Sequence, residues 1–490
     1  MDREALVYVD LDGIPSLMGR LSARVRKNKE SASFEYDEAW LQHPARFSLE
    51  PALQLGPGAF HTPADTPMFG AIGDSAPDRW GRALMRRMER RRAEREGGAP
   101  RTLQEIDYLL LVDDEARQGA LRFAEREGGP FLREEGVKRI PPLVELPQLL
   151  SAAEHVTEDK DTEEDLRLLF APGSSLGGAR PKASVIEKDG HLSIAKFPRK
   201  DDEINTVVWE AVALALAKKA GIAVPTFRVE LIAKKPVLLL RRFDRDGARR
   251  IPFLSAMSML GSKDNETRSY LEIVDALRQH GAASKADMEA LWRRVVFNIL
   301  ISNSDDHLRN HGFLYSGQDG WRLSPAYDLN PVPTDVKPRI LSTAINEDDN
   351  TASLAIALDV AGYFELDAAQ AQEIVGRLAR SSRSGATKPR GTASAKQKST
   401  AWGRLLSMRI CASQAGGSDV GVCLVGLLGA RAFQQNQQTH IVNEVRLGSR
   451  NRFRVTVMAQ FFGVNPSVET VWNWHTCSFD LPRFLRHLLS

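Results

Sequence analysis

The sequence predicts an α+β fold in which a lobe containing strands precedes a lobe built from helices. Short apolar or alternating segments, such as residues 183–186 and 191–197, are typical of strands. Apolar residues at helical spacing follow later, as in residues 291–300. A chain of 490 residues with 42% hydrophobic residues can form two or three domains with separate cores.

The net charge of +3 is unevenly distributed along the chain. Residues 381–490 hold 14 basic and 4 acidic residues, which leaves 52 basic and 59 acidic residues in residues 1–380. The basic excess belongs to the tail, so the overall charge does not predict a nucleic-acid-binding protein. No apolar run is long enough to span a membrane and the first residues do not resemble a signal peptide, so we expect no membrane contact and a cytoplasmic location. The three cysteines have no metal-site or disulfide spacing.

Residues 1–125 are predicted to form a small α+β domain. A strand at residues 6–13 returns through residues 19–21, and further strands are expected at residues 34–36 and 119–123. Residues 107–112 fit a helix or a strand. Between the strands expected at residues 34–36 and 119–123 lies a strongly basic helix at residues 82–95. Glu89 and Glu94 interrupt its basic residues, and Glu96 follows it. The interleaved acids favour a solvated charged face over a nucleic-acid contact.

Residues 126–245 contain a loop of small residues whose backbone can approach phosphate oxygens closely. The loop includes Ser174, Ser175, Gly177 and Gly178, and Lys182 adds positive charge. By itself this pattern also fits an ordinary flexible turn.

Lys196 and Glu210, which follow this loop in the chain, suggest a nucleotide site. Lys196 ends the strand of residues 191–197, and Glu210 lies in a helix at residues 206–220 that Asn205 caps. A strand lysine paired with a helix glutamate is the arrangement that fixes a lysine on nucleotide phosphates. A buried strand at residues 237–240 then leads to residues 241–245, which we interpret as the hinge between two lobes.

Residues 246–380 are predicted to form a helical lobe, with helices at residues 254–261 and 270–279. After the helix ending near residue 300, the chain turns abruptly polar. Asp305 stands five residues before Asn310, and a hairpin at residues 311–323 leads to Asp328. Each of these residues alone could cap a helix or close a turn. Together, in the order phosphate loop, lysine, glutamate, aspartate, asparagine and aspartate, they follow the order of a protein kinase.

Several motifs are more specific than this order. LVYVDLDG, MFGAIGDSAPDRWGR, SSLGGARPKASV, SIAKFP, RRFDRDG, NSDDHLRNHGFL and SPAYDLNP resemble the HipA family, the kinase toxins of HipBA-type toxin–antitoxin modules. The similarity runs from about residue 5 to residue 380 and implies a protein-kinase-like two-lobed fold with an extra N-terminal subdomain. It implies that Asp305 is the catalytic base, that Asn310 and Asp328 hold Mg²⁺, and that Lys196 contacts the phosphates of ATP.

The resemblance also implies regulation and partners. Ser175 would be autophosphorylated, which would expel its loop and inactivate the kinase. The expected protein substrate is an aminoacyl-tRNA synthetase, typically the glutamyl enzyme, and the expected partner is a helix-turn-helix antitoxin that contacts operator DNA.

Two alternatives remain open from the sequence. One is a catalytically weak kinase-fold protein that mainly partners a DNA-binding antitoxin repressor, and the other is a small-molecule kinase, because the site does not select a protein acceptor. Residues 381–490 depart from the family pattern abruptly, beginning with SSRSGATKPRGTASAKQKS. We interpret this tail as a frameshifted or fused segment.

Overall fold

The structure is a computed structural model. It describes residues 2–27, 29–132, 140–170, 178–202, 205–264, 266–317, 320–332 and 339–383, together with five short strands between residues 409 and 480. No helix in these described ranges is both long and apolar enough to cross a membrane.

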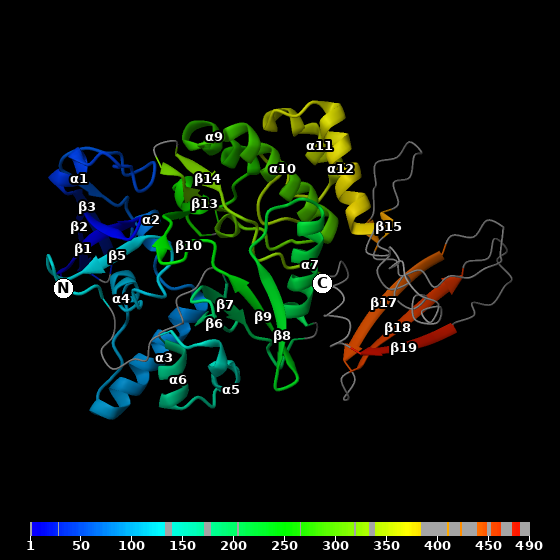
Figure 1. The fold of residues 1–490 in the computed structure, drawn as a ribbon, viewed down its shortest axis with the longest axis horizontal. Coiled ribbons are helices and arrows are strands. Elements are labelled where there is room, and N and C mark those ends of the chain that lie inside the picture. The colour runs from blue at the N-terminus through cyan, green and yellow to red at the C-terminus, as the bar shows by residue number, and fades with distance from the viewer. Residues whose placement is uncertain are drawn as a thin grey trace.

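A five-stranded antiparallel sheet organises the N-terminal part of the chain, in the order β4-β3-β2-β1-β5 (Figure 1). Val7 and Val9 of β1 are fully buried in the core, because alternate residues of a strand face the same side. Trp40 and Phe34 pack into the same cluster. The elements are β1 (Asp2–Leu11), β2 (Ile14–Arg26), β3 (Lys29–Tyr36), α1 (Glu38–Gln42), β4 (Ala59–His61), α2 (Gly70–Gly73) and β5 (Leu121–Ala124).

Four further helices precede the second sheet in the chain. Asp78 caps the longest of them by accepting a hydrogen bond from the backbone N–H of Gly81, and Gly97 ends it with a φ of 68°. Glu89 is buried and paired with Arg92 and Arg101, whereas most arginines of the helix are exposed, as expected for a solvated charged face. The helices are α3 (Arg79–Glu96), α4 (Glu105–Leu110), α5 (Leu146–Thr157) and α6 (Glu163–Phe170), with a 3₁₀ turn at Leu143–Glu145.

A second sheet of four antiparallel strands, in the order β6-β7-β9-β8, has different partners on its two faces. Leu238 and Leu240 belong to the same apolar cluster as helix α7, whereas Val237 and Leu239 pack with residues of α5 and α6. This alternation explains why the strand is apolar throughout. The elements are β6 (Lys182–Ile186), β7 (Leu192–Lys196), α7 (Thr206–Lys219), β8 (Phe227–Ile232) and β9 (Lys235–Arg241).

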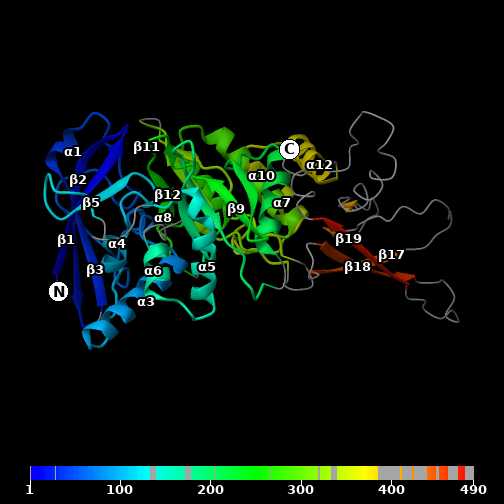
Figure 2. The same cartoon turned by 60° about the horizontal axis from the view of Figure 1, so that its bottom comes forward.

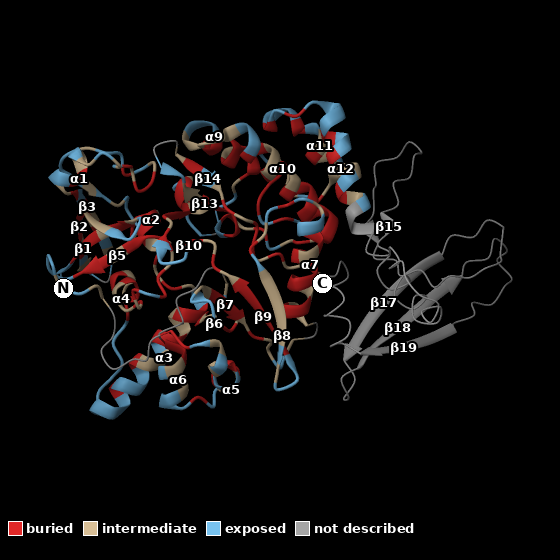
Figure 3. Ribbon diagram, viewed as in Figure 1, coloured by how far each residue is buried: buried red, intermediate tan, exposed pale blue. Residues whose placement is uncertain are grey.

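The following region is mainly helical, as the sequence predicts, and buried residues concentrate along its central helix α10 (Figure 3). The helix expected at residues 254–261 is partly wrong. Leu254 pairs with Phe313 in a three-stranded sheet, so only Ala256–Met259 of that segment is helical. The elements are β10 (Arg245–Asp246), β11 (Arg249–Arg250), β12 (Phe253–Ser255), α8 (Ala256–Met259), α9 (Tyr270–His280), α10 (Ser284–Ile301), β13 (Gly312–Tyr315), β14 (Trp321–Leu323), α11 (Leu354–Asp359) and α12 (Ala368–Arg383), with 3₁₀ turns at Leu308–Asn310 and Ala361–Phe364.

Beyond the end of α12 at Arg383, the described part of the tail contains only strands. β15 (Arg409–Ile410) pairs with β16 (Val422–Cys423), and β17 (Thr439–Leu447), β18 (Arg452–Phe461) and β19 (Asn473–Asp480) form an antiparallel sheet.

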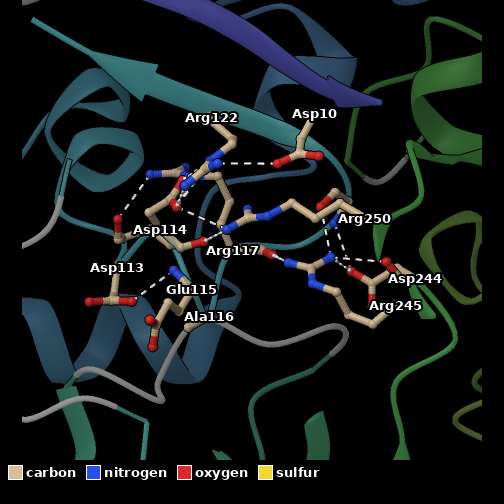
Figure 4. Close-up of polar contacts among 12 residues, drawn as sticks. Asp10, Asp113, Asp114, Glu115, Ala116, Arg117, Arg122, Asp244, Arg245 and Arg250 are labelled. Atoms are coloured by element: carbon tan, nitrogen blue, oxygen red, sulfur yellow. Dashed lines mark hydrogen bonds and ion pairs between the residues drawn. The ribbon is translucent and has the colours of Figure 1, made fainter. Parts of the chain in front are cut away.

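A buried ionic network joins the N-terminal sheet to the segment after β9 (Figure 4). Asp244 is fully buried and accepts hydrogen bonds from Arg242, Arg245 and the backbone N–H of Gly119. Arg245 also donates to the carbonyl oxygens of Arg117 and Gly119. The segment that we interpret as a hinge, residues 241–245, is therefore held in place by hydrogen bonds to residues 117–119 of the N-terminal part of the chain.

One buried carboxyl near this junction should make stability depend on pH. Burial raises the pKa of Glu50 to about 7, although the backbone N–H of Ala71 donates to it at 2.5 Å. Because the folded-state pKa is raised, the contribution of Glu50 is fully present below about pH 4.5 and is lost as the pH rises through 7.

We expect Glu50→Gln to remove this dependence. Relative to the wild type, the variant should gain about 3 kcal/mol in free energy of unfolding between pH 4.5 and pH 8. Urea denaturation of both proteins across this range measures the difference, in which groups common to both cancel. A difference that is constant with pH would contradict the prediction.

Candidate functional site

The site is centred on Lys196, at the end of β7. Its Nζ atom lies 2.6 Å from Oε1 of Glu210 on α7 and 2.8 Å from Oδ1 of Asp328, beyond β14. All three side chains are largely buried, at 12%, 4% and 13% exposure. Residues up to 132 positions apart in the chain thus meet at one ammonium group.

The electrostatics of this cluster keep the lysine and Asp328 charged. Burial opposes charge on both groups, but the carboxylates of Asp328 and Glu210 outweigh it and raise the pKa of Lys196. Likewise, Lys196 and Lys182 outweigh the effect of burial and lower the pKa of Asp328. A charged ammonium group and a charged carboxylate therefore face each other at the end of β7.

A second lysine lies beside the first. Lys182 is only 1% exposed, and its Nζ atom lies 2.7 Å from Oδ2 of Asp78 and 3.2 Å from the carbonyl oxygen of Gly178. Gly178 has a φ of 84°, and a Cβ atom there would lie 3.6 Å from Nζ of Lys182 and 3.9 Å from Oδ2 of Asp328. The end of the small-residue loop therefore approaches both ion pairs closely, in a conformation that glycine favours.

Ser174, Ser175 and Gly177 lie outside the residues that the structure describes. Asp78 was missed by the sequence reasoning. Its position before a helix indicates a cap, which it is, but nothing in the local sequence indicates that its other oxygen receives Lys182 from 104 residues away.

The loop after α10 holds Asp305 and Asn310. The amide nitrogen of Asn310 donates to the carbonyl oxygen of Asp305 at 2.7 Å, which fixes the five-residue span between them. Asp305 is exposed, whereas the adjacent Asp306 is buried and accepts hydrogen bonds from Tyr270 and the backbone of Ser342. Of the two neighbouring carboxylates, only Asp305 is exposed to solvent.

Two contacts tie this loop to the segment that carries Asp328. The hydroxyl of Tyr327 donates to the carbonyl oxygen of Arg309 at 2.6 Å. The backbone N–H of Asn330 donates to Oδ1 of Asn303 at 3.4 Å. The residues flanking Asp328 are therefore fixed against both ends of the loop.

The donor set fits a hard cation. Oδ1 of Asn310 is buried and accepts no hydrogen bond from the described residues, and Asp328 adds a carboxylate. Amide and carboxylate oxygens are the ligands that Mg²⁺ prefers, usually together with substrate phosphates and water. Within the described ranges no group of three or more His, Cys, Asp or Glu side chains is placed so that it could hold a metal ion.

A strand lysine paired with a helix glutamate, beside a loop with aspartate and asparagine and a further aspartate, defines a protein-kinase-like fold of two lobes. Residues 174–386 match the sequence model of the HipA-like C-terminal domain. The similarity to this domain covers a little under half of the chain. The match ends at residue 386, close to where the composition changes.

Individual proteins are also similar to this chain. A Haemophilus influenzae candidate kinase is 25% identical over 209 residues, covering 37% of this chain and 61% of its own length. The Sinorhizobium fredii candidate kinase Y4mE is 26% identical over 354 residues, covering 64% of this chain and 75% of its own. The fold is similar to Shewanella oneidensis HipA, solved with HipB and operator DNA, with a TM-score of 0.54 and 18% identity over 77% of this chain and 88% of that one.

Proposed function

We propose that this protein is an ATP-dependent serine/threonine protein kinase and the toxin of a type II toxin–antitoxin module. The observation that carries the proposal is the position of Lys196 between Glu210 and Asp328. In kinases, such a lysine is held by the helix glutamate and contacts phosphates, and the second aspartate binds the metal. We propose domain boundaries near residues 125, 245 and 380.

Each residue has a distinct proposed role. Asp305 accepts the proton of the acceptor hydroxyl, which its exposure permits. Asn310 and Asp328 hold Mg²⁺, which when bound neutralises charge on the phosphates. Lys196 and Lys182 contact ATP phosphates, and Glu210 orients Lys196.

The loop of Ser174, Ser175, Gly177 and Gly178 would cover the phosphates. Close approach of Gly178 to Lys182 and Asp328 supports this placement. We propose that Ser175 is autophosphorylated. The added negative charge would repel the nucleotide phosphates, so the loop could no longer hold them.

The proposed partners follow from the family. The structural relative is a HipA bound to HipB and operator DNA. We therefore propose a helix-turn-helix antitoxin as partner, DNA contact through that antitoxin, and a cytoplasmic site of action. The proposed substrate is a translation component such as glutamyl-tRNA synthetase.

Intact-mass spectrometry of the purified protein with Mg²⁺-ATP tests the activity. We expect one added phosphate on Ser175, and none when Mg²⁺ is chelated. A folded protein that binds ATP but gains no phosphate and modifies no added protein would favour the alternative role as a repressor partner. Phosphate transfer only to small metabolites would favour a small-molecule kinase.

Asp328→Asn should separate nucleotide binding from metal binding. We expect the Kd for Mg²⁺-ATP to rise at least about tenfold, which corresponds to about 1.4 kcal/mol. Binding of ATP without Mg²⁺ should be unchanged or stronger, because Lys196 loses a competing carboxylate but keeps Glu210. Calorimetric titrations with and without Mg²⁺ measure both values, and an equal loss in the two conditions would contradict the assigned role.

A further inference from the structure

Helix α3 carries more arginines than its carboxylate neighbours can pair. Five of them form ion pairs: Arg82 with Glu105, Arg87 with Asp159 and Asp161, Arg91 with Glu94, Arg92 with Glu89 and Arg95 with Glu163. The other three, Arg79, Arg86 and Arg90, are exposed and have no carboxylate partner among the described residues. We call these three residues the arginine stripe.

The stripe is a continuous feature of one helix face. At 3.6 residues per turn, positions 79, 86 and 90 lie within about 20° of one direction, and the three Cα atoms span about 16 Å along the axis. The helix runs from the middle of the molecule to its margin, and its outer end is exposed (Figures 1, 2 and 3). The arginines therefore form a straight positive track.

The track begins at the candidate active site. Arg79 directly follows Asp78, whose carboxylate holds Lys182. Arg309, in the loop that carries Asp305, forms an ion pair with Asp264. Hydrogen bonding from Arg309 and the nearby charges of Arg79 and His307 lower the pKa of Asp264, which agrees with a position of Arg79 close to that loop. A molecule that presents a hydroxyl to Asp305 can therefore extend along α3.

We propose that the arginine stripe binds an acidic segment of the protein that receives the phosphate. This inference rests on the proposed kinase function, because the acceptor is then the molecule that must lie at the start of the stripe. Guanidinium groups bind carboxylates with paired hydrogen bonds, and carboxylates two residues apart on an extended strand repeat at about 6.6 Å, near the roughly 6 Å between positions 86 and 90.

A nucleic acid fits this surface less well. Trp80 of α3 is buried, and Tyr108 lies beneath Arg82, so neither ring offers a stacking surface beside the stripe. Glu94 and Glu96 lie exposed at the outer end, where a phosphate backbone would be repelled. A polypeptide can avoid this repulsion, because it needs acidic residues only near its acceptor hydroxyl and not along its whole length.

The test uses the full chain with two synthetic peptides that share one serine, one followed by six glutamates and the other by six glutamines. Arg86→Gln/Arg90→Gln removes two charges of the stripe and leaves Asp78 and Arg79 intact. Arg95→Gln/Arg167→Gln removes the same charge from two exposed arginines that both pair with Glu163, and serves as the matched control. Fluorescence anisotropy measures binding without nucleotide, and phosphate transfer gives kcat and KM.

For the glutamate peptide, we expect the stripe variant to raise Kd and KM about five- to tenfold, with kcat unchanged and the control within about twofold. High salt should weaken binding of the wild type toward the level of the variant.

Equal affinities for the two peptides, or equal losses in both variants, would overturn the stripe as a docking site while leaving kinase activity intact. Binding of the glutamate peptide through the stripe without phosphate transfer would support the surface and count against the kinase function. Binding of a twenty-nucleotide thymidine strand through the stripe, without binding of the peptide, would overturn the proposal in favour of nucleic acid.

Discussion

Asp305→Asn is expected to lower the rate of phosphoryl transfer about a thousandfold while leaving ATP affinity within about threefold. An amide cannot accept the proton of the attacking hydroxyl, but it has nearly the same shape as the carboxylate. The side-chain amide of Asn310 donates to the backbone carbonyl of Asp305. This hydrogen bond does not involve the Asp305 side chain, so it should survive the substitution. Single-turnover transfer with radiolabelled ATP measures the rate, and calorimetry measures the affinity.

Asp348→Asn provides the control for this measurement. Asp348 is also an exposed aspartate of the same helical region, and its substitution removes the same charge. We expect no more than a twofold change in rate. If Asp305→Asn retained full activity, the assignment of the base would be wrong, and the neighbouring carboxylates would have to be reconsidered.

Asp244→Ala is expected to destabilise the protein by about 3–5 kcal/mol. The substitution leaves the guanidinium groups of Arg242 and Arg245, at 3% and 8% exposure, without their shared carboxylate. An uncompensated buried charge is strongly destabilising, whereas the intact pair itself adds little. Because a whole protein is stable by only about 5–15 kcal/mol, the loss should be evident in the urea midpoint.

Asp246→Ala is the matched control for the network. Asp246 lies two residues further on, in strand β10, and is exposed. We expect a change of no more than about 0.5 kcal/mol. Equal effects of the two substitutions would show that burial of Asp244 is not what makes it important. A rise in the Kd for ATP in Asp244→Ala at low temperature, where the protein stays folded, would further indicate that residues 117–119 hold the segment after β9 in its working position.

The local sequence determined much of the fold. Alternation predicts the strand that carries Lys196, and helical spacing with an asparagine cap predicts the helix that carries Glu210. The α+β, kinase-like fold class is confirmed. Residues 254–261 show the limit of local sequence, because the pairing of Leu254 with Phe313 places the start of the expected helix in a strand.

The order of chemistry-bearing residues along the chain, from the small-residue loop to Asp328, is a property of sequence alone. Which of them meet was decided by tertiary structure. The sequence placed Lys182 in a phosphate loop, but only packing of α3 against β6 gives it Asp78 as a partner, with the indole N–H of Trp80 donating to its carbonyl oxygen. The sequence of α3 does not distinguish its eight arginines, and only the folded neighbours separate the five that form ion pairs from the three that form none with the described residues. Ion pairing depends on distances of a few ångströms between segments far apart in the chain, and local sequence does not encode those distances.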